Sequence, residues 1–89
     1  MTVERSTTIK NRLGLHARPA AEVVKTAGRF QSNITVGKDG MWVNAKSILG
    51  VMTLAAEFGS TLTVRAEGDD AEQAVEALIT VLQKQFVEG

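Results

Sequence analysis

The spacing of apolar residues changes from segment to segment along this chain, and it predicts seven elements of secondary structure. Four short segments show the alternation that is typical of half-buried strands, in which successive side chains point to opposite faces. The first strand is predicted over Arg5 to Ile9. The alternating positions are Thr7 and Ile9, Ile34 and Val36, Met41 and Val43, and Leu62, Val64 and Ala66. Between the second and third strands, Asp39-Gly40 supplies the residues that a tight hairpin turn requires.

Three other segments carry apolar residues three or four positions apart, which predicts helices with one buried face. The first helix opens near Pro19 and ends near Gly28, and the second begins after Ser47. We expect Ser47 to cap the second helix, and Asp69 to cap the third with Glu72 as its capping-box partner. The three apolar stripes are Ala20, Val23, Val24, Ala27 and Phe30; Ile48, Val51, Met52 and Leu54; and Ala74, Val75, Leu78, Val81, Leu82 and Phe86.

These elements follow one another in the order β-α-β-β-α-β-α, which predicts an α+β fold in one domain over residues 1–89. Because the four strands alternate in pattern, we expect one sheet with its helices packed on a single face. The strand order does not follow from the pattern. Met41 and Val43 point to one face of the third strand, so Trp42 should lie on the face opposite the helices and Val43 beneath them.

Composition limits the functions that such a domain can have. Ten Lys and Arg residues balance ten Asp and Glu residues, and aromatic residues make up 4% of the chain. Neither a basic field nor a stacking platform for nucleic acid is therefore expected. The chain has no cysteine and one histidine, which argues against disulfides and a metal site. Since no apolar run is long enough to span a membrane, we expect a cytoplasmic protein without membrane insertion.

The single histidine, His16, lies in the stretch from Asn11 to Ala20, just before or within the first turn of the predicted helix. Backbone N–H groups at a helix start lack intrahelical partners, and the helix dipole favours an anion there. Arg18 adds a cation two residues away, and Pro19 needs no backbone donor in a first turn. The sequence leaves open whether His16 or Arg18 is the capping residue.

A histidine in this setting is suited to carry a phosphoryl group. A neutral imidazole is nucleophilic, and helix N–H groups with a guanidinium can stabilise the charge on a transferring phosphoryl group. The chain has neither a P-loop nor a G-x-G-x-x-G motif for a nucleotide. We therefore expect a carrier that receives its phosphoryl group from another protein. We expect no cofactor, and we do not expect a stand-alone enzyme. The alternative at this point is a solvated surface histidine with no chemical role.

Two stretches resemble the HPr family, the histidine-containing phosphocarriers of the bacterial phosphoenolpyruvate-dependent sugar phosphotransferase system. L-G-L-H-A-R-P-A-A, which contains His16, resembles the active-site signature, and Ala45 to Leu54 resembles the regulatory-serine helix. The resemblance implies an open-faced β-sandwich, a four-stranded antiparallel sheet with three helices on one face. It also implies that enzyme I phosphorylates His16 on Nδ1, that a sugar-specific IIA domain receives the group, and that Arg18 stabilises it.

Ser47 stands at the start of the second motif's helix. A serine before an apolar run is a good helix cap, which is the simplest interpretation. The resemblance adds a second one, phosphorylation by an HPr kinase/phosphorylase. A phosphate at a helix N-terminus is electrostatically favourable, so the fold would tolerate it.

The second predicted helix carries more apolar residues than one face can bury. Core packing accounts for some of them, and the resemblance favours an exposed patch beside His16 that docks partner proteins. The expected docking residues are Leu15, Ile48, Leu49 and Met52, with Lys25 and Lys46 at the rim to steer acidic partners. We expect the carrier to be a monomer.

A rival hypothesis makes the chain a regulatory docking module. It would serve a nitrogen-related phosphotransferase branch or a transcription regulator, with phosphorylation of His16 as its switch. His16 discriminates between the hypotheses, because a module that only docked would not need it.

Overall fold

The computed structural model describes residues 1–85, and these residues form four strands and three helices. The strands are β1 (Thr2–Thr8), β2 (Asn33–Lys38), β3 (Met41–Asn44) and β4 (Thr61–Glu67). The helices are α1 (Ala17–Ala27), α2 (Ile48–Thr53) and α3 (Ala71–Leu82). The predicted order β-α-β-β-α-β-α is confirmed.

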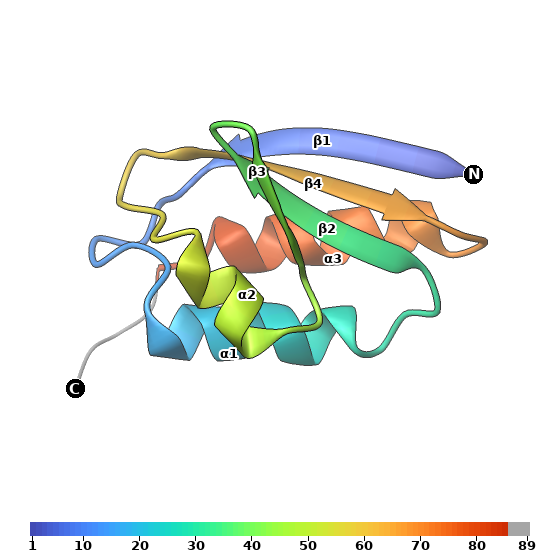
Figure 1. Ribbon diagram of the computed structural model, residues 1–89, viewed down its shortest axis with the longest axis horizontal. Helices are drawn as coiled ribbons and strands as arrows, with labels where there is room; N and C mark the ends of the chain where they lie inside the picture. Colours follow the sequence, from blue (N-terminus) through green and yellow to red (C-terminus); the bar gives the residue numbers. More distant parts are fainter. Residues whose placement is uncertain (86–89) are drawn as a thin grey trace.

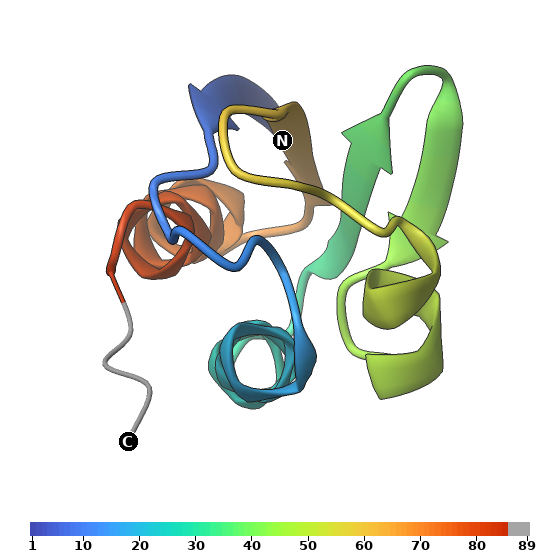
Figure 2. The same cartoon turned by 90° about the vertical axis from the view of Figure 1, so that its left-hand side faces the viewer.

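The strands form one antiparallel sheet in the order β1-β4-β2-β3. Figure 1 shows that the helices of residues 1–85 all lie on one face of this sheet, so that the other face is left open. Seen end-on in Figure 2, the sheet and the helices form two layers. The expected open-faced β-sandwich is therefore confirmed.

The core lies between the two layers and is built from the predicted apolar positions. In β4, the alternating residues Leu62, Val64 and Ala66 are buried, whereas the residues between them are more exposed. The helical stripes contribute Ala20, Val23, Ala27, Ala74, Val75, Leu78, Val81 and Leu82. Phe30 lies beyond the end of α1 and packs half-buried against the core, and Phe86 lies outside the described residues.

Strand β1 is longer than the predicted segment and begins at Thr2 rather than Arg5. It pairs with β4 along its whole length. Most of its residues are polar, so the alternation along it is faint, and Val3 and Thr7 are only half-buried. Ile9 is buried but lies just beyond the strand. Pairing with the apolar β4 therefore defines β1 more than its own pattern does.

The hairpin between β2 and β3 turns at Asp39 and Gly40, whose φ angles are 51° and 84°. Lys38 pairs with Met41, so the turn has two residues. Positive φ at both central residues matches the twist of the flanking strands. The predicted hairpin is confirmed.

Trp42 lies on the open face of the sheet, as its alternation with Val43 predicts. It pairs with Gly37, where an added Cβ atom would lie 2.7 Å from the indole, so the ring covers this glycine. The exposed fraction of Trp42 is 45%. Val43 packs against the core but stays half-buried, because β3 is an edge strand.

The start of α3 differs from the predicted capping box. Asp70 rather than Asp69 holds the capping position, and its side chain makes no hydrogen bond to the helix. The Asp70 carboxylate instead accepts hydrogen bonds from the backbone N–H groups of Gln31 (2.8 Å) and Ser32 (3.0 Å) and from the Ser32 hydroxyl. It therefore joins the segment after α1 to the start of α3, a contact that local spacing does not reveal. Glu72 lies in the first turn of α3, where its charge suits the helix dipole.

These hydrogen bonds lower the pKa of the Asp70 carboxyl below its ordinary value of 3.8, and the bond from the Ser32 hydroxyl has the largest effect. Because the folded-state pKa is the lower one, Asp70 adds stability above the unfolded-state pKa, and this is lost as the pH falls through the folded-state pKa. We expect Asp70→Asn to lower the melting temperature at about pH 7, and the difference from the parent to shrink below about pH 4.

Thermal unfolding followed by circular dichroism across this pH range measures the effect. Asp69→Asn removes the same charge one residue away and should leave the parent's pH dependence in place. A difference between Asp70→Asn and the parent that stays constant down to about pH 2 would contradict the role of the ionised carboxylate.

Candidate functional site

His16 is the residue immediately before α1. Its backbone is extended, with φ of −88° and ψ of −168°, and it holds the N-cap position. Ala17, Arg18 and Pro19 are therefore the first three residues of the helix, and the Ala20 N–H donates to the His16 carbonyl at 2.9 Å. Of the two capping residues that the sequence leaves open, the structure selects His16. Pro19 takes one of the first-turn positions that need no intrahelical donor.

The loop before His16 is shaped by Asn11 and Gly14. The buried side-chain amide of Asn11 donates to the Gly14 carbonyl at 2.8 Å, and the Gly14 N–H donates to the Asn11 carbonyl at 3.0 Å. Gly14 has a φ of +74°, in the left-handed region that favours glycine. These bonds close a tight turn two residues before His16.

Leu15 does not belong to an exposed patch, so this part of the predicted docking surface is wrong. Its side chain is 6% exposed and forms part of the core. Its N–H donates to the carbonyl of Ala56, in the segment after α2, at 2.8 Å. Burial of a leucine side chain removes apolar surface from water in the folded protein itself. Leu15 therefore anchors the chain immediately before His16.

The segment after α2 supports this loop from the other side. An added Cβ atom at Gly14 would lie 2.4 Å from the Ala56 carbonyl oxygen, so the two segments pack backbone against backbone (Figure 2). Ala55 has a φ of +47°, a conformation that costs a non-glycine residue about 1–3 kcal/mol. The Lys38 ammonium donates to the carbonyls of Leu54 and Ala55, both at 3.3 Å. A positive charge is thereby placed beside the C-terminal end of α2, where the helix dipole favours it.

The imidazole of His16 is half-buried, and its Nε2 atom is buried. A partner protein therefore has poor access to Nε2, which favours Nδ1 as the reactive nitrogen. Arg18, in the first turn of the same helix, is exposed. The site thus combines a ring nucleophile, the positive end of a helix dipole and a guanidinium. Within residues 1–85, no group of three or more His, Cys, Asp or Glu side chains could hold a metal ion.

Helix α2 presents an apolar surface to solvent. Its capping residue is Ser47, whose hydroxyl oxygen accepts a hydrogen bond from the Gly50 N–H at 3.1 Å, as predicted. Val51 is buried, whereas three large side chains are exposed: Ile48 at 39%, Leu49 at 77% and Met52 at 42%. Their proposed docking role stays a prediction.

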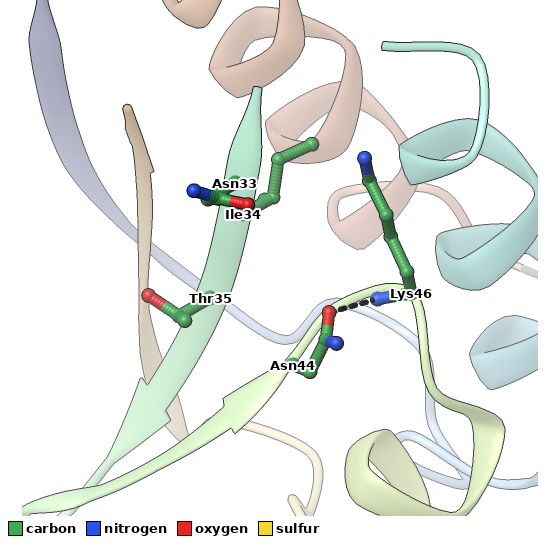
Figure 3. A pocket seen from close by; sticks show the side chains of 5 residues that line it. All are labelled: Asn33, Ile34, Thr35, Asn44 and Lys46. Carbon is green, nitrogen blue, oxygen red and sulfur yellow. Dashed lines mark hydrogen bonds between the residues drawn. The ribbon is translucent and has the colours of Figure 1, made fainter. Parts of the chain in front are cut away.

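Lys25 and Lys46 lie toward the far end of α1 from His16. Lys25 is in the last turn of α1, and the Lys46 ammonium donates to the Phe30 carbonyl, beyond that end, at 2.8 Å. A helix of 11 residues is about 16 Å long, so neither lysine borders the histidine. Lys46 therefore lies beside the start of α2 and close to the end of α1 that carries Lys25. Figure 3 shows Lys46 in a pocket lined also by Asn33, Ile34, Thr35 and Asn44.

A family model described as the PTS HPr component phosphorylation site matches residues 3–84. The chain belongs to the HPr family. It is 46% identical over 87 residues to the phosphocarrier protein HPr of Cupriavidus necator, a match that covers 98% of each chain. It is 51% identical over 83 residues to the HPr-like protein Crh of Halalkalibacterium halodurans, covering 93% of this chain and 99% of that one.

Solved structures of HPr proteins agree with this assignment. The crystal structure of a phosphocarrier protein HPr from Bacillus anthracis matches with a TM-score of 0.88 and 48% identity, over 92% of this chain and 98% of that chain. These likenesses support a phosphocarrier role in the phosphotransferase system. An HPr dimer from Thermoanaerobacter tengcongensis also matches, with a TM-score of 0.71 and 52% identity, over 84% of this chain and 86% of that chain. The expected monomer therefore stays a prediction. No helix within the described residues is long and apolar enough to cross a membrane.

Two exposed apolar residues of this HPr-family chain were not predicted as site residues. Leu13 is 63% exposed and Phe58 is 62% exposed. Each stands in a loop, outside the periodic patterns from which a buried or exposed face is predicted. Their only signal in the sequence is a large apolar side chain within one residue of a glycine.

The close packing of Gly14 against Ala56 predicts a stability effect at the start of the HPr active-site signature. Gly14→Ala adds a Cβ atom both to a left-handed residue and against a carbonyl oxygen, and we expect it to lower the free energy of unfolding by about 2–4 kcal/mol. Gly59→Ala is the matched control, because Gly59 has a φ of +84° with nothing within 4 Å of its added Cβ atom.

Urea denaturation of both variants measures the difference. Gly59→Ala adds only backbone strain, so we expect it to lower the free energy of unfolding by about 1 kcal/mol. Equal losses in the two variants would mean that the contact between the loops adds nothing beyond this strain.

Proposed function

We propose that this chain carries a phosphoryl group on Nδ1 of His16, accepts it from enzyme I and passes it to a IIA domain. The observation that carries the proposal is the position of His16 as the N-cap of α1, with Nε2 buried. Membership of the HPr family supports the same role. The exchange would take place in the cytoplasm, the compartment predicted from the sequence.

The proposed transfer needs no oxidant and no added cofactor. In the neutral imidazole with its proton on Nε2, the lone pair of Nδ1 attacks the phosphorus atom held by the donor. The bond from phosphorus to the donor breaks as the Nδ1–P bond forms, and the donor keeps that bond's electron pair. Delivery to the IIA domain runs the same exchange again, with Nδ1 as the leaving group. The carrier is regenerated unchanged.

The residues around His16 have the charge that this transfer requires. Phosphoryl transfer depends mainly on positioning and on stabilising the negative charge of the phosphoryl oxygens. The first-turn N–H groups and the dipole of α1 favour an anion at His16. Arg18 adds an exposed guanidinium, whose fork of N–H donors can bind two phosphoryl oxygens at once. The partner protein must supply the rest of the active site, which is why the chain acts as a carrier and not as a stand-alone enzyme.

Labelling from phosphoenolpyruvate and enzyme I tests the acceptor. The parent should acquire a label that is stable in base and labile in acid, as expected of a phosphohistidine. His16→Ala should lose the label completely while keeping the parent's circular dichroism spectrum, and full labelling of this variant would exclude His16. Arg18→Ala should still be labelled, but roughly ten- to a thousandfold more slowly, because one contact to transition-state charge is lost. Arg29→Ala, an exposed arginine beyond the other end of α1, is the control.

The exposed side chains of α2 are the proposed docking surface for both partners. Ile48, Leu49 and Met52 present apolar surface that the fold does not bury. Helix α2 also leads directly into residues 54–56, which contact the loop before His16. A partner bound to α2 is therefore held close to His16. Lys25 and Lys46 would steer acidic partners toward the start of this helix.

Ser47 is proposed as a regulatory phosphorylation site for an HPr kinase/phosphorylase. Its side chain is half-buried and already bonded to Gly50, which supports the simpler capping role as well. A phosphate there would carry about −1.5 to −2 charge at the positive end of α2, so the fold should survive. The same charge would disfavour an acidic partner on the neighbouring apolar surface.

A Ser47→Asp variant should therefore label more slowly on His16, with the loss appearing as weaker binding to enzyme I. One carboxylate carries less charge than a phosphate, so the effect should be partial. Ser47→Asn is the matched control, because asparagine caps a helix equally well but carries no charge. The measurement is the labelling rate against enzyme I concentration at fixed salt. If Ser47→Asp and Ser47→Asn label alike at every concentration, charge at this position does not regulate docking.

A regulatory docking module remains the second candidate, because Crh of Bacillus subtilis, another similar protein, is described as a catabolite repression HPr. Such a module would bind a transcription regulator or serve a nitrogen-related phosphotransferase branch. The labelling experiment separates the two functions, because only the carrier hands the label on to a IIA domain. Label that stays on His16 in the presence of IIA domains would favour the module.

A further inference from the structure

Two large apolar side chains lie in solvent at the same end of the molecule as His16. Leu13 belongs to the loop before α1, and Phe58 belongs to the loop between α2 and β4. Their exposed fractions, 63% and 62%, are among the highest of the large apolar side chains within residues 1–85. Neither is part of the α2 docking surface proposed above.

Hydrogen bonds hold these two loops together at both ends. The Ile9 N–H donates to the Ser60 carbonyl at 2.9 Å, and the Gly59 N–H donates to the Ile9 carbonyl at 3.0 Å. At the other end, the Leu15 N–H donates to the Ala56 carbonyl at 2.8 Å. Residues 9–15 and 56–60 therefore run antiparallel to each other, which brings the middle of one loop opposite the middle of the other. Leu13 and Phe58 stand in these middle parts.

The paired loops adjoin the phosphorylation site. Figures 1 and 2 both show them side by side at the end of the molecule where α1 begins. In Figure 2, the start of α1 lies between α2 and the loop that precedes α1. Helix α2 and the paired loops therefore flank the start of α1.

The charge around the paired loops is mostly positive, although the whole chain has no net charge. From Ser6 to Ala21 the sequence holds Lys10, Arg12 and Arg18 and no acidic residue. All three side chains are exposed. Glu57, next to Phe58, is the acidic residue of the paired loops. Apolar side chains framed by cations fit a protein surface on which apolar residues are framed by carboxylates.

We propose that Leu13 and Phe58 form a second apolar contact for the proteins that exchange a phosphoryl group with His16. The inference rests on the proposed carrier function and extends its docking surface across the start of α1. The partner contacts α2 on one side of His16 and the paired loops on the other, so that its reactive group is held between two apolar contacts. A second copy of this chain is a poorer fit, because it would set Lys10, Arg12 and Arg18 against like charges.

The double variant Leu13→Gln, Phe58→Gln tests this contact in the labelling reaction with phosphorylated enzyme I. We expect KM for the carrier to rise roughly tenfold with little change in kcat, as for loss of binding energy shared by the ground and transition states. Met41→Gln is the matched control, since Met41 is an exposed apolar residue (48%) on the β2–β3 hairpin, and its KM should equal that of the parent. Far-UV circular dichroism checks that each variant is folded.

An unchanged KM in the double variant, with normal labelling of the parent, overturns the contact and leaves the carrier function standing. A lower kcat at unchanged KM also overturns it, because the loops would then position His16 rather than bind a partner. If the parent is not labelled at all, the proposed carrier function is wrong. Calorimetric titration with unphosphorylated enzyme I then tests the proposed apolar contact separately. Weaker binding of the double variant supports it there, and equal binding overturns it.

Two further results complete the test. If the double variant unfolds, Leu13→Gln and Phe58→Gln are measured singly, and an unchanged KM in both overturns the proposal. Sedimentation of the parent and the double variant tests self-association. A dimer that is present in the parent and lost in the double variant makes this surface an interface between copies of the chain, which also overturns the proposal.

Discussion

The contact between residues 9–15 and residues 56–60 holds the His16 end of the molecule in place. Three backbone hydrogen bonds and the close approach of Gly14 to Ala56 join segments that are far apart in the sequence. Each such bond adds only about 1 kcal/mol net, but breaking one would leave a polar group without its partner. The burial of the Leu15 side chain adds an apolar contribution to the stability of this end of the molecule. Because His16 directly follows Leu15 and caps α1, the contact also fixes where the imidazole stands.

The chemistry proposed for His16 depends on this placement. A side chain at a helix N-cap meets the positive end of the dipole, and burial of Nε2 favours Nδ1 as the nitrogen that would accept a phosphoryl group. Little else is needed on a carrier, since the partner brings its own catalytic groups to the transfer. A small domain with one sheet and one layer of helices can therefore do this work. Its stability has to come mainly from the core between those layers.

Features that depend on residues close in sequence could be predicted from the chain. The helical stripes, the alternation in β4, the Asp39-Gly40 turn and the Ser47 cap belong to this group. Features that depend on distant partners could not. The extent of β1 follows from its pairing with β4. The Asp70 carboxylate accepts hydrogen bonds from the N–H groups of Gln31 and Ser32 rather than from its own helix. The burial of Leu15 could not be predicted from its neighbours in the sequence. It depends on the distant segment around Ala56, whose carbonyl binds the Leu15 N–H.

The length of α2 limits how a charge on Ser47 can act on His16. Ser47 stands before the first residue of α2, near Lys46, whereas the segment beyond the last residue of α2 contacts the loop before His16. The helix between them has six residues and is about 9 Å long, comparable to a Debye length of about 8 Å at physiological ionic strength. A charge on Ser47 would therefore change the electrostatics at His16 only weakly. Any strong effect on phosphoryl transfer must act through a partner that covers both ends of α2 at once.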